Sequence, residues 1–516
     1  VSLLILSRID YCNSLLSFVT ILCLLTLPSV VIAAKILFLA YPSFSHLQNM
    51  AILGDVLNER GHEVWMSATS DLEEKLKLKS RNIKATPFSS EDKLIASIEN
   101  MKNGNETSPS DVYFKTGERI LNVELIKWTC HVMLTDELFL STIKEQKFDL
   151  VVLDIIPIVN MLNLIPYKFD IPFVYFGPAY IPYHTRTPYS PSFVPFPVLP
   201  MSDRMSFLER VVNTIINGVN VFYDPFSYYR AAAIYVPEKP YIEVYDLILK
   251  AQLYIIERDD VFRSPVPTMP NVKRINPITS TRKDKIPQEY STFLDRSKNG
   301  VILVSFGSMV PTNNNTIYTK LVMAFGKTKY DFIIKGDFVE GNERMMVSKW
   351  IPQRPLLSHK NVKLFITHCG ANGIGEAIIN GVPMLGFPIF AEQPGNAQNM
   401  AARGYAKTED ITDNINEIIE NPSYKTSIHK ASQIVQELEK RENPSEVAAF
   451  WIEHVIKFGG DYRRSASVDM PLYQYILLDV LAFLILICIV VLTLLFCCLR
   501  TCYRMTCSRK PKVKSS

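Results

Sequence analysis

The most concentrated group of side chains that could do chemistry lies in the segment 365–393, FITHCGANGIGEAIINGVPMLGFPIFAEQ. The apolar residues up to Thr367 predict a strand, and a helix is expected to begin near Asn372 after a His-Cys-Gly turn. Backbone N–H groups and the dipole at a helix N-terminus attract anions, and His368 adds a side-chain donor. Glu376 follows about one turn later, where its carboxylate could bind sugar hydroxyls. The segment therefore predicts a site for a phosphate beside hydroxyl-rich groups.

A second strand in the same segment delivers two further polar side chains. The run PMLGFPIF is followed by Glu392 and Gln393, which are expected on a loop at the carboxyl end of that strand. Ligands of open α/β sheets bind at this edge. The segment contains neither GxGxxG nor GxxxxGK[ST], so a dinucleotide site or a P-loop would lack its fingerprint.

A histidine and an aspartate near the start of the chain could form a general base and its partner. His46 closes the turn YPSFSH, which follows the apolar run KILFLAY, and Asp154 ends the run FDLVVLD. A His of near-neutral pKa can deprotonate an acceptor hydroxyl, and a carboxylate can fix its tautomer. Asp149 competes with Asp154 but begins the same strand, so it is expected at the far edge in a structural role. The remaining histidines have no comparable setting.

The elements that would position these residues follow an alternating pattern. Strand, helix and strand signals succeed one another from residue 35, and the pattern restarts at 300–306. Such alternation predicts parallel sheets covered by helices. The segment 256–290 contains the Pro-rich stretch RSPVPTMPNVKRINP, which is typical of a linker. We therefore expect an α/β chain with two domains.

The motifs resemble the signature of the animal UDP-glycosyltransferase family, a class of membrane-bound UDP-glucuronosyltransferases and UDP-glucosyltransferases. The signature elements stand in order in FITHCG, Asn372-Gly373, Glu376, Pro383, Pro388 and Glu392-Gln393. Two flanking motifs, VSFGS at 304–308 and WIPQ at 350–353, are also similar, and the resemblance runs from Ala34 to the tail. It implies the GT-B fold, in which two Rossmann-like domains face a cleft.

The resemblance also implies roles for individual positions. Trp350 would stack on the uracil, Glu376 would take the ribose hydroxyls, and Glu392 with Gln393 would bind the transferred sugar. His46 and Asp154 match the catalytic pair of animal members. The family often has Asp where this chain has Glu392, which leaves the sugar preference open. The residues that would bind UDP are Ser308, Trp350, Gln353, His368, Gly370, Asn372, Gly373 and Glu376.

The two ends of the chain predict membrane topology. Residues 480–499, VLAFLILICIVVLTLLFCCL, carry no charge and are long enough to cross a bilayer. The tail that follows carries six basic residues and no acid, so it is expected in the cytosol. Residues 14–33 have the composition of a signal peptide, with a signal anchor as the alternative. Residues 1–13 resemble a retrotransposon fragment more than a signal n-region, so the start could be a fragment or misjoined.

These observations predict a type I protein of the endoplasmic reticulum membrane with a lumenal body. The final KVKSS matches a dilysine retrieval signal, although a basic stop-transfer flank would look the same. Asn105 and Asn314 lie in glycosylation sequons, each a weak signal on its own. The expected organisation is a signal peptide (1–33), an acceptor domain (34–255), a linker (256–290), a UDP-sugar domain (291–440), a membrane-proximal helical segment (441–474), a span (475–499) and a tail (500–516).

Composition narrows the function further. The net charge is +4, but the tail contributes six positive charges and the rest of the chain is slightly acidic, so nothing indicates nucleic-acid binding. Only Cys130 and Cys369 lie in the body, which excludes a disulfide scaffold and argues against an adhesion ectodomain. No His, Cys and Asp cluster has the spacing of a metal site. No metal and no cofactor are expected, because a UDP-sugar would be a co-substrate.

The predicted function is inverting transfer of glucuronic acid or glucose, with galactose ranked lower, from a UDP-sugar to a small lipophilic alcohol or phenol. The aromatic and Pro-rich segment 173–196 could line the acceptor pocket or could simply be a packed loop. Membrane lipid is an expected partner, and a homo-oligomer is compatible with the sequence. The alternative is a membrane-tethered binding protein that has lost catalysis. The segment between Gly404 and Asn421 is about seven residues shorter than the family pattern.

Overall fold

A computed structural model of the chain describes residues 33–507 except for short gaps. The gaps are 104–111, 114–118, 122, 189, 223–226, 258–259, 279–284, 309–315, 337–338, 390 and 409–410. The chain forms two compact units, Val1–Arg463 and Arg464–Ser516. The signal-peptide prediction, both sequons and the final lysines lie outside the described residues.

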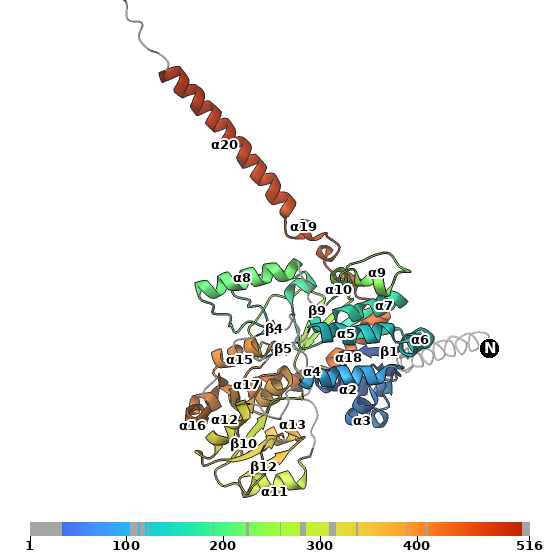
Figure 1. Cartoon of the computed structure of the whole chain (residues 1–516), viewed down its shortest axis with the longest axis vertical. Coiled ribbons are helices and arrows are strands. Elements are labelled where there is room, and N and C mark those ends of the chain that lie inside the picture. Colours follow the sequence, from blue (N-terminus) through green and yellow to red (C-terminus); the bar gives the residue numbers. More distant parts are fainter. Residues whose placement is uncertain are drawn as a thin grey trace, which may run out of the picture. The chain divides into compact units, whose positions relative to one another are not determined.

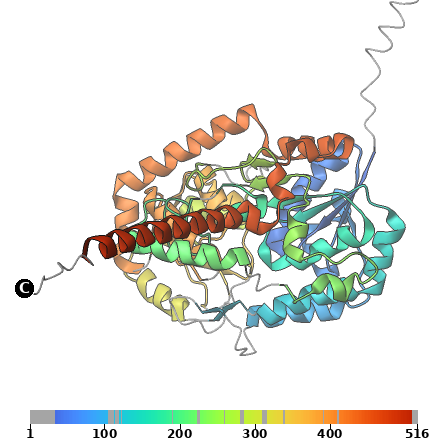
Figure 2. The ribbon, with the colours of Figure 1, turned by 90° about the horizontal axis from the view of Figure 1, so that it is seen from above.

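The first half of the larger unit is built on a parallel sheet of seven strands (Figures 1 and 2). In spatial order the strands are β3 (Lys84–Ala85), β2 (Glu63–Met66), β1 (Lys35–Leu39), β6 (Leu150–Asp154), β7 (Phe173–Gly177), β8 (Tyr254–Glu257) and β9 (Val272–Ile275). The order reverses between β1 and β6, as in doubly wound nucleotide-binding folds.

The four central strands of this sheet, β1, β6, β7 and β8, are apolar almost throughout because both faces are covered by helices. Leu37 and Leu39 of β1 pack into one core, and Ile36 and Phe38 pack into the core on the opposite face. This alternation follows from the two-residue period of a strand. One core is covered mainly by α5 (Val123–Thr135), α6 (Glu137–Gln146), α7 (Leu164–Phe169) and α10 (Val244–Ile248), and the other by α2 (Phe44–Glu59), α3 (Ser70–Leu76) and α18 (Pro444–Phe458).

The second half is built on a parallel sheet of six strands with the same winding. In spatial order they are β12 (Met345–Ser348), β11 (Asp331–Lys335), β10 (Val301–Ser305), β13 (Val362–Thr367), β14 (Met384–Gly386) and β15 (Ala406–Thr408). One face is covered by α11 (Gln288–Arg296), α13 (Gln353–Leu357), α14 (Ala371–Ile379), α15 (Gln393–Ala402) and α17 (Pro422–Arg441), and the other by α12 (Thr316–Phe325) and α16 (Ile411–Glu420).

The larger unit has further elements outside the two sheets, some of which also pack into the core of the first sheet. They are α4 (Glu91–Asn103), the short antiparallel pair β4 (Val112–Tyr113) and β5 (Arg119–Leu121), α8 (Phe207–Phe222) and α9 (Ala231–Tyr235).

The expected linker at 256–290 starts too early in the chain. β9 lies inside that range and pairs in register with β8, so the first domain continues to Ile275. The Pro-rich stretch that suggested a linker comprises part of the loop between these two strands and β9 itself. A crossover loop and an interdomain linker share this composition, which is why proline content alone misplaced the boundary.

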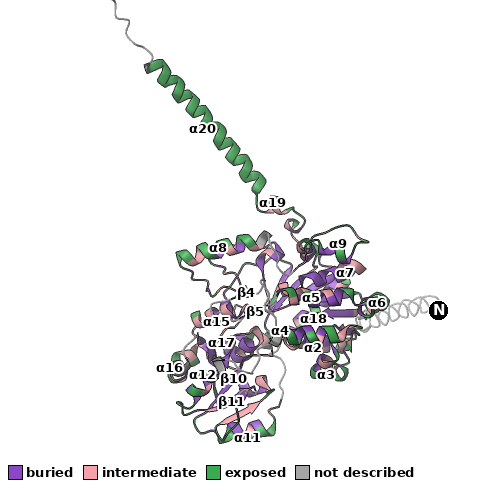
Figure 3. Ribbon diagram, viewed as in Figure 1, coloured by how far each residue is buried: buried purple, intermediate pink, exposed green. Residues whose placement is uncertain are grey.

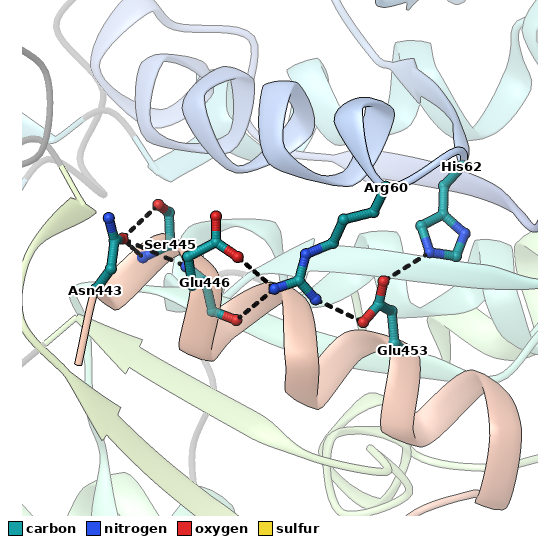
Figure 4. A network of polar contacts seen from close by, with 6 residues as sticks. All are labelled: Arg60, His62, Asn443, Ser445, Glu446 and Glu453. Carbon is teal, nitrogen blue, oxygen red and sulfur yellow. Dashed lines mark hydrogen bonds and ion pairs between the residues drawn. The ribbon is translucent and has the colours of Figure 1, made fainter. Parts of the chain in front are cut away.

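The membrane-proximal helical segment expected at 441–474 begins with a helix that belongs to the first domain. Ala448, Ala449 and Ile452 of α18 are fully buried in the core that contains α2. A polar network holds the same helices together (Figure 4). Arg60 pairs with Glu446 and donates to Glu453 over 2.6 Å.

His62 and the N-cap of α18 complete this network. His62 Nε2 lies 3.1 Å from Glu453 Oε1, and the side chain of Asn443 accepts from the backbone N–H of Glu446 over 3.4 Å (Figure 4). An Asn at the N-cap satisfies one of the free N–H groups of a helix start. The chain therefore leaves the second domain, and α18 packs against the first domain.

The smaller unit contains α19 (Leu472–Tyr475) and the long helix α20 (Leu478–Cys507). Within α20, Leu478–Thr506 is long and apolar enough to cross a membrane. Its side chains are exposed along its length, in contrast to the buried strands of the body (Figure 3). The helix contains most of the span expected at 475–499 and continues beyond it.

Candidate active site

The sequence-predicted base and its partner lie on either side of the point where the strand order of the first sheet reverses. β1 runs into the turn before α2, which carries His46, and the neighbouring strand β6 ends at Asp154. The carboxyl ends of parallel strands meet at one edge of a sheet. This topology brings together two residues that lie more than one hundred positions apart.

His46 and Asp154 form a close pair. His46 Nδ1 lies 2.9 Å from Asp154 Oδ2, and the Asp154 side chain is almost completely buried. Burial by itself would lower the pKa of His46, but the charge and hydrogen bond of Asp154 and the charge of Glu392 outweigh it, so the pKa is raised above 6.5. With Nδ1 held by the carboxylate, Nε2 is the nitrogen that can exchange a proton with a ligand.

Asp149 occupies the opposite end of β6, as expected. Its Oδ2 accepts a hydrogen bond from the backbone N–H of Lys35 over 2.7 Å. This hydrogen bond links the start of β1 to the neighbouring strand. It gives Asp149 a structural role, so no catalytic role is needed to account for an acid at this position.

The phosphate turn predicted in the second domain also lies at a reversal of strand order. Ser308 follows β10, His368 follows β13, and these two strands are neighbours. The ring of His368 lies directly against two glycines, since a Cβ at Gly307 or at Gly370 would come within about 2.6 Å of its Nε2. Gly307 also has φ of +77°, which a residue with a side chain rarely adopts. Both glycines are required for the imidazole to reach the turn.

His368 is a neutral donor or acceptor, because its pKa is lowered to about 4 by burial and by the nearby charge of Lys335. Its Nδ1 is buried without a hydrogen-bond partner among the described residues. The positive charge at this edge is carried by Lys335, whose Nζ donates to the carbonyl of Gly307 over 2.8 Å. The same ammonium lies 4.4 Å from the centre of the Trp350 ring.

Trp350, Gln353 and Glu376 gather on the nucleoside side expected from the motifs. Trp350 is 53% exposed and contacts Phe44 of α2 edge-to-face, with ring centres 4.9 Å apart. Gln353 Nε2 donates to Glu376 Oε2 over 2.8 Å. Burial raises the pKa of Glu376 to about 7, despite this hydrogen bond. The carboxyl is thus held in place by a residue of the WIPQ motif.

Asn372 joins the two domains as well as shaping the turn before α14. Its Nδ2 donates to the carbonyl of Ser45 over 3.1 Å, and its Oδ1 accepts from Asn49 over 3.2 Å. Ser45 immediately precedes His46. The turn expected to hold the diphosphate is therefore hydrogen-bonded to the helix that carries His46.

The two residues predicted to bind the transferred sugar have different settings. Glu392 occupies the N-cap position of α15 without a side-chain capping hydrogen bond, and its charge acts on both His46 and Arg263. Gln393 is buried, and its Oε1 accepts from the backbone N–H of Ile389 over 2.9 Å. Gly373 lies against the Phe365 ring and Gln353, where a Cβ would be in contact at about 3.5 Å. Glu392 therefore lies in the second domain close enough for its charge to act on His46.

Two polar residues at the carboxyl ends of strands were not predicted from the sequence. They are Lys335 in the second sheet and Glu257 in the first. Glu257 ends β8 and is buried, and both of its oxygens accept from Asn49 Nδ2, over 3.0 and 2.9 Å. Burial raises its pKa to about 7, with a further contribution from the charge of Asp154. Lys335 ends the apolar strand DFIIK and Glu257 ends the apolar strand YIIE. A polar residue at the end of an apolar strand is the same signal that identified Asp154.

Part of the aromatic and Pro-rich segment lines a cavity between the two domains. Its walls comprise Tyr180, Pro182, 194–197, Leu199 and Met201 from the first half of the chain, with Arg263, Val266, Gly395, Asn396 and Asn399. The backbone carbonyl of Pro197 lies so close to Gly395 that a Cβ there would come within 2.3 Å of it. The described residues contain no group of three His, Cys, Asp or Glu side chains that could hold a metal ion.

Comparison with known proteins places these motifs in a family. Residues 34–513 match the family model described as "UDP-glucoronosyl and UDP-glucosyl transferase". The chain is 31% identical to human UDP-glucuronosyltransferase 2B7 over 493 residues, which cover 88% of this chain and 91% of that protein. It is 29% identical to human UDP-glucuronosyltransferase 1A6 over 500 residues, which cover 92% of each.

Solved structures share the two-sheet architecture of GT-B glycosyltransferases. A UDP-glucosyltransferase from Polygonum tinctorium, capable of glucosylating indoxyl and solved with 3,4-dichloroaniline, aligns with a TM-score of 0.58 at 14% identity. The alignment covers 83% of this chain and all of that structure. At this identity the likeness concerns the fold alone, and it agrees with the GT-B fold expected from the motifs.

Proposed function

The chain belongs to the family of UDP-glucuronosyl and UDP-glucosyl transferases, and on this basis we propose an inverting transfer of the sugar to a hydroxyl of a small lipophilic acceptor. Family membership makes the chain a glycosyltransferase that uses a UDP-sugar. The observation that carries the finer proposal is the pair formed by His46 and Asp154, with Nδ1 and Oδ2 2.9 Å apart.

In the proposed reaction His46 is the general base. Its Nε2 takes the proton of the acceptor O–H while the acceptor oxygen forms a bond to C1 of the sugar. The bond between C1 and the phosphate oxygen breaks, and UDP departs with the electron pair. Attack from the face opposite UDP inverts C1. Asp154 orients the ring and stabilises the imidazolium, as a carboxylate does in hydrolase triads.

The leaving diphosphate gains negative charge in the transition state, and the turn before α14 is suited to receive it. The N-terminus of α14 offers backbone N–H groups, with Ser308 and neutral His368 nearby as further donors. Lys335 supplies the positive charge beside this turn. UDP-sugar enters as a co-substrate, and no further cofactor takes part in the proposed steps.

The proposed donors are UDP-glucuronate and UDP-glucose, ahead of UDP-galactose. The human relatives named above are glucuronosyltransferases, which makes UDP-glucuronate the first to test. Glu392 would bind hydroxyls of the transferred sugar. A second carboxylate, that of the glucuronate, would be repelled by Glu392, so we propose that a cation offsets this repulsion. Arg263 is the candidate, because burial lowers its pKa while the nearby charge of Glu392 raises it.

The proposed location is the endoplasmic reticulum membrane, with α20 as a type I anchor, a lumenal body and a cytosolic tail. An anchor suits acceptors that partition into lipid. In sealed microsomes, protease should remove a tag placed behind the basic tail while leaving the body intact until detergent is added. Asn105→Gln with Asn314→Gln should abolish any endoglycosidase-sensitive mobility. Protection of the tag together with digestion of the body would reverse the orientation.

The catalytic proposal is tested by comparing His46→Ala and Asp154→Asn with the unmodified chain in microsomes. Parallel assays use UDP-glucuronate, UDP-glucose and UDP-galactose with phenolic and steroidal acceptors. His46→Ala should lose transfer almost entirely, by at least about a hundredfold, while UDP affinity is retained. Asp149→Asn is the matched control for Asp154→Asn, because it neutralises the far end of the same strand and should leave the chemistry intact.

Two outcomes would change the proposal. Full activity of His46→Ala would show that another group is the base. Absence of transfer with every donor and acceptor, combined with intact UDP binding, would favour the alternative of a membrane-tethered binding protein.

A further inference from the structure

Helix α8 presents its apolar side to the outside and its polar side to the protein. Asn213 is fully buried and Asn217 nearly so, whereas Leu208 and Ile215 are 72% and 59% exposed. This is the reverse of a helix that packs on a soluble core. The large apolar side chains exposed on α8 are Phe207, Leu208, Val211, Val212, Ile215 and Val219.

These six residues form one continuous stripe. They recur at three- and four-residue spacing, which places them on the same side of an α-helix. The other exposed residues between 207 and 219 are Thr214 and Gly218, and the Thr214 hydroxyl donates to the backbone carbonyl of Arg210. The stripe therefore offers no charged group, and Figure 3 shows α8 with long exposed stretches.

Hydrogen bonds from Asn213 fix this orientation. Its Oδ1 accepts from the backbone N–H of Phe196 over 2.8 Å, and its Nδ2 donates to the carbonyls of Pro191 and Val194 over 2.7 and 2.9 Å. Asn217 Nδ2 in turn donates to the Asn213 carbonyl and side chain. Turning the helix to bury its apolar stripe would break the three bonds between Asn213 and the segment 191–196 and leave buried polar groups unsatisfied. The apolar side must be covered by something other than this domain.

We propose that the apolar stripe of α8 docks into the surface of the bilayer to which the chain is anchored. The stripe has the composition of helices that lie in the membrane interface, where apolar side chains enter the boundary between headgroups and acyl chains. Residues 464–477 connect the body to α20, and an extended chain of that length spans at most about 50 Å. The body thus stays close to any bilayer that α20 crosses. A stripe without polar groups matches acyl chains better than a specific protein partner.

The bilayer contact would bear directly on the acceptor pocket. The backbone that Asn213 holds, from 191 to 196, continues into residues that line the cavity between the two domains. A docked α8 would therefore bring that cavity beside the membrane, so that an acceptor dissolved in lipid could enter without crossing water. This consequence rests on the proposed lipophilic acceptor, whereas the docking itself does not.

The test uses single tryptophan substitutions in the full chain, reconstituted in phosphatidylcholine vesicles with and without brominated acyl chains. Ile215→Trp probes the stripe. Ile487→Trp, within α20, is the positive control, and Met323→Trp, at an exposed site on α12, is the negative control. After subtraction of the four native tryptophans, brominated lipid should remove most of the added fluorescence at positions 215 and 487 and little at 323.

Each result bears on a separate statement. Quenching at 487 without quenching at 215 would overturn the docking of α8 but keep the anchor, and loss of quenching at 487 would overturn the anchor itself. A photoreactive side chain at 215 that links two copies of the chain, with no lipid quenching, would assign the stripe to a dimer and overturn the proposal.

Ile215→Asp should raise KM severalfold for an acceptor delivered in lipid and leave KM unchanged for a water-soluble acceptor and for the UDP-sugar. Equal effects on both acceptors would contradict the link to the pocket.

Discussion

Glu257 is a buried carboxyl that holds Asn49 and so supports the contact between α2 and Asn372. We expect Glu257→Ala to lower kcat/KM by about tenfold and to destabilise the fold by about 1–3 kcal/mol, because Asn49 and the backbone N–H of Ile278 lose a buried acceptor. Glu257→Gln keeps an acceptor oxygen and should retain most activity. Steady-state kinetics on both variants check this, and equal loss in the two would mean that the charge itself is required.

The two buried acids Glu257 and Glu376 also predict how stability depends on pH. Each has a folded-state pKa raised from 4.5 to about 7, so the folded protein binds the proton more tightly than the unfolded chain. Their stabilising contribution is complete below about pH 4.5 and is lost as the pH rises towards 7, by up to about 3 kcal/mol each. Unfolding of the ligand-free protein in detergent should therefore occur at lower temperature at pH 7.5 than at pH 5.

Substitutions identify the source of this pH dependence. Glu257→Gln and Glu376→Gln should each flatten the profile, because neither replacement titrates. Glu289→Gln, which removes an exposed carboxyl on α11, should leave it unchanged. A profile that keeps its slope in both buried variants would refute the assignment.

At the scale of single residues, the sequence predicted positions whose side-chain type and place after a strand indicate chemistry. It missed residues whose role depends on contacts with distant parts of the chain. His46 and Asp154 were predicted because a base and an acid follow apolar strands. Glu257 also ends a strand, but its role depends on Asn49, two hundred residues away along the chain. Lys335 likewise acquires its role from Gly307 and Trp350. Contacts of this range follow from the winding of the sheets, which the local pattern does not contain.

Among the elements, α18 carries the clearest consequence for stability. Ile452 is fully buried between α18 and the first sheet, whereas Phe450 on the same helix is half exposed. Ile452→Ala should lower the free energy of unfolding by about 2–4 kcal/mol through the cavity it leaves. Phe450→Ala, which removes more atoms, should cost at most about 1 kcal/mol. Denaturant unfolding of the full chain in detergent measures both, and a larger loss for Phe450→Ala would contradict this packing.

The strands and most helices could be predicted from apolar periodicity, but the partner of α18 could not. Its sequence, with apolar residues on one side, indicates only that one face is covered. The partner is fixed by the core around Ile452 and by the pairing of Arg60 with Glu446 and Glu453 (Figure 4). β9 was missed for a related reason, since four residues beside a Pro-rich loop carry too little pattern to indicate a strand.

At the scale of the whole body, the proposed mechanism requires His46 in the first domain and the turn before α14 in the second to be held in register. Asn372 provides this link through Ser45 and Asn49. We expect Asn372→Ala to reduce kcat by about tenfold or more, because a small misplacement of reacting groups is costly. UDP affinity should change less, since Ser308, His368 and Lys335 remain.

A double-mutant cycle on Asn49 and Asn372 tests whether their hydrogen bond carries the coupling. If it does, the double variant Asn49→Ala with Asn372→Ala should lose less activity than the two single losses combined, with an interaction energy of about 0.5–1.5 kcal/mol in the transition state. Asn58, at the other end of α2, is the matched control, because its Nδ2 donates to the backbone carbonyls of residues 81 and 82 in the first domain. Asn58→Ala should add independently to Asn372→Ala. Full additivity for Asn49 as well would mean that the two domains are aligned by packing rather than by this amide pair.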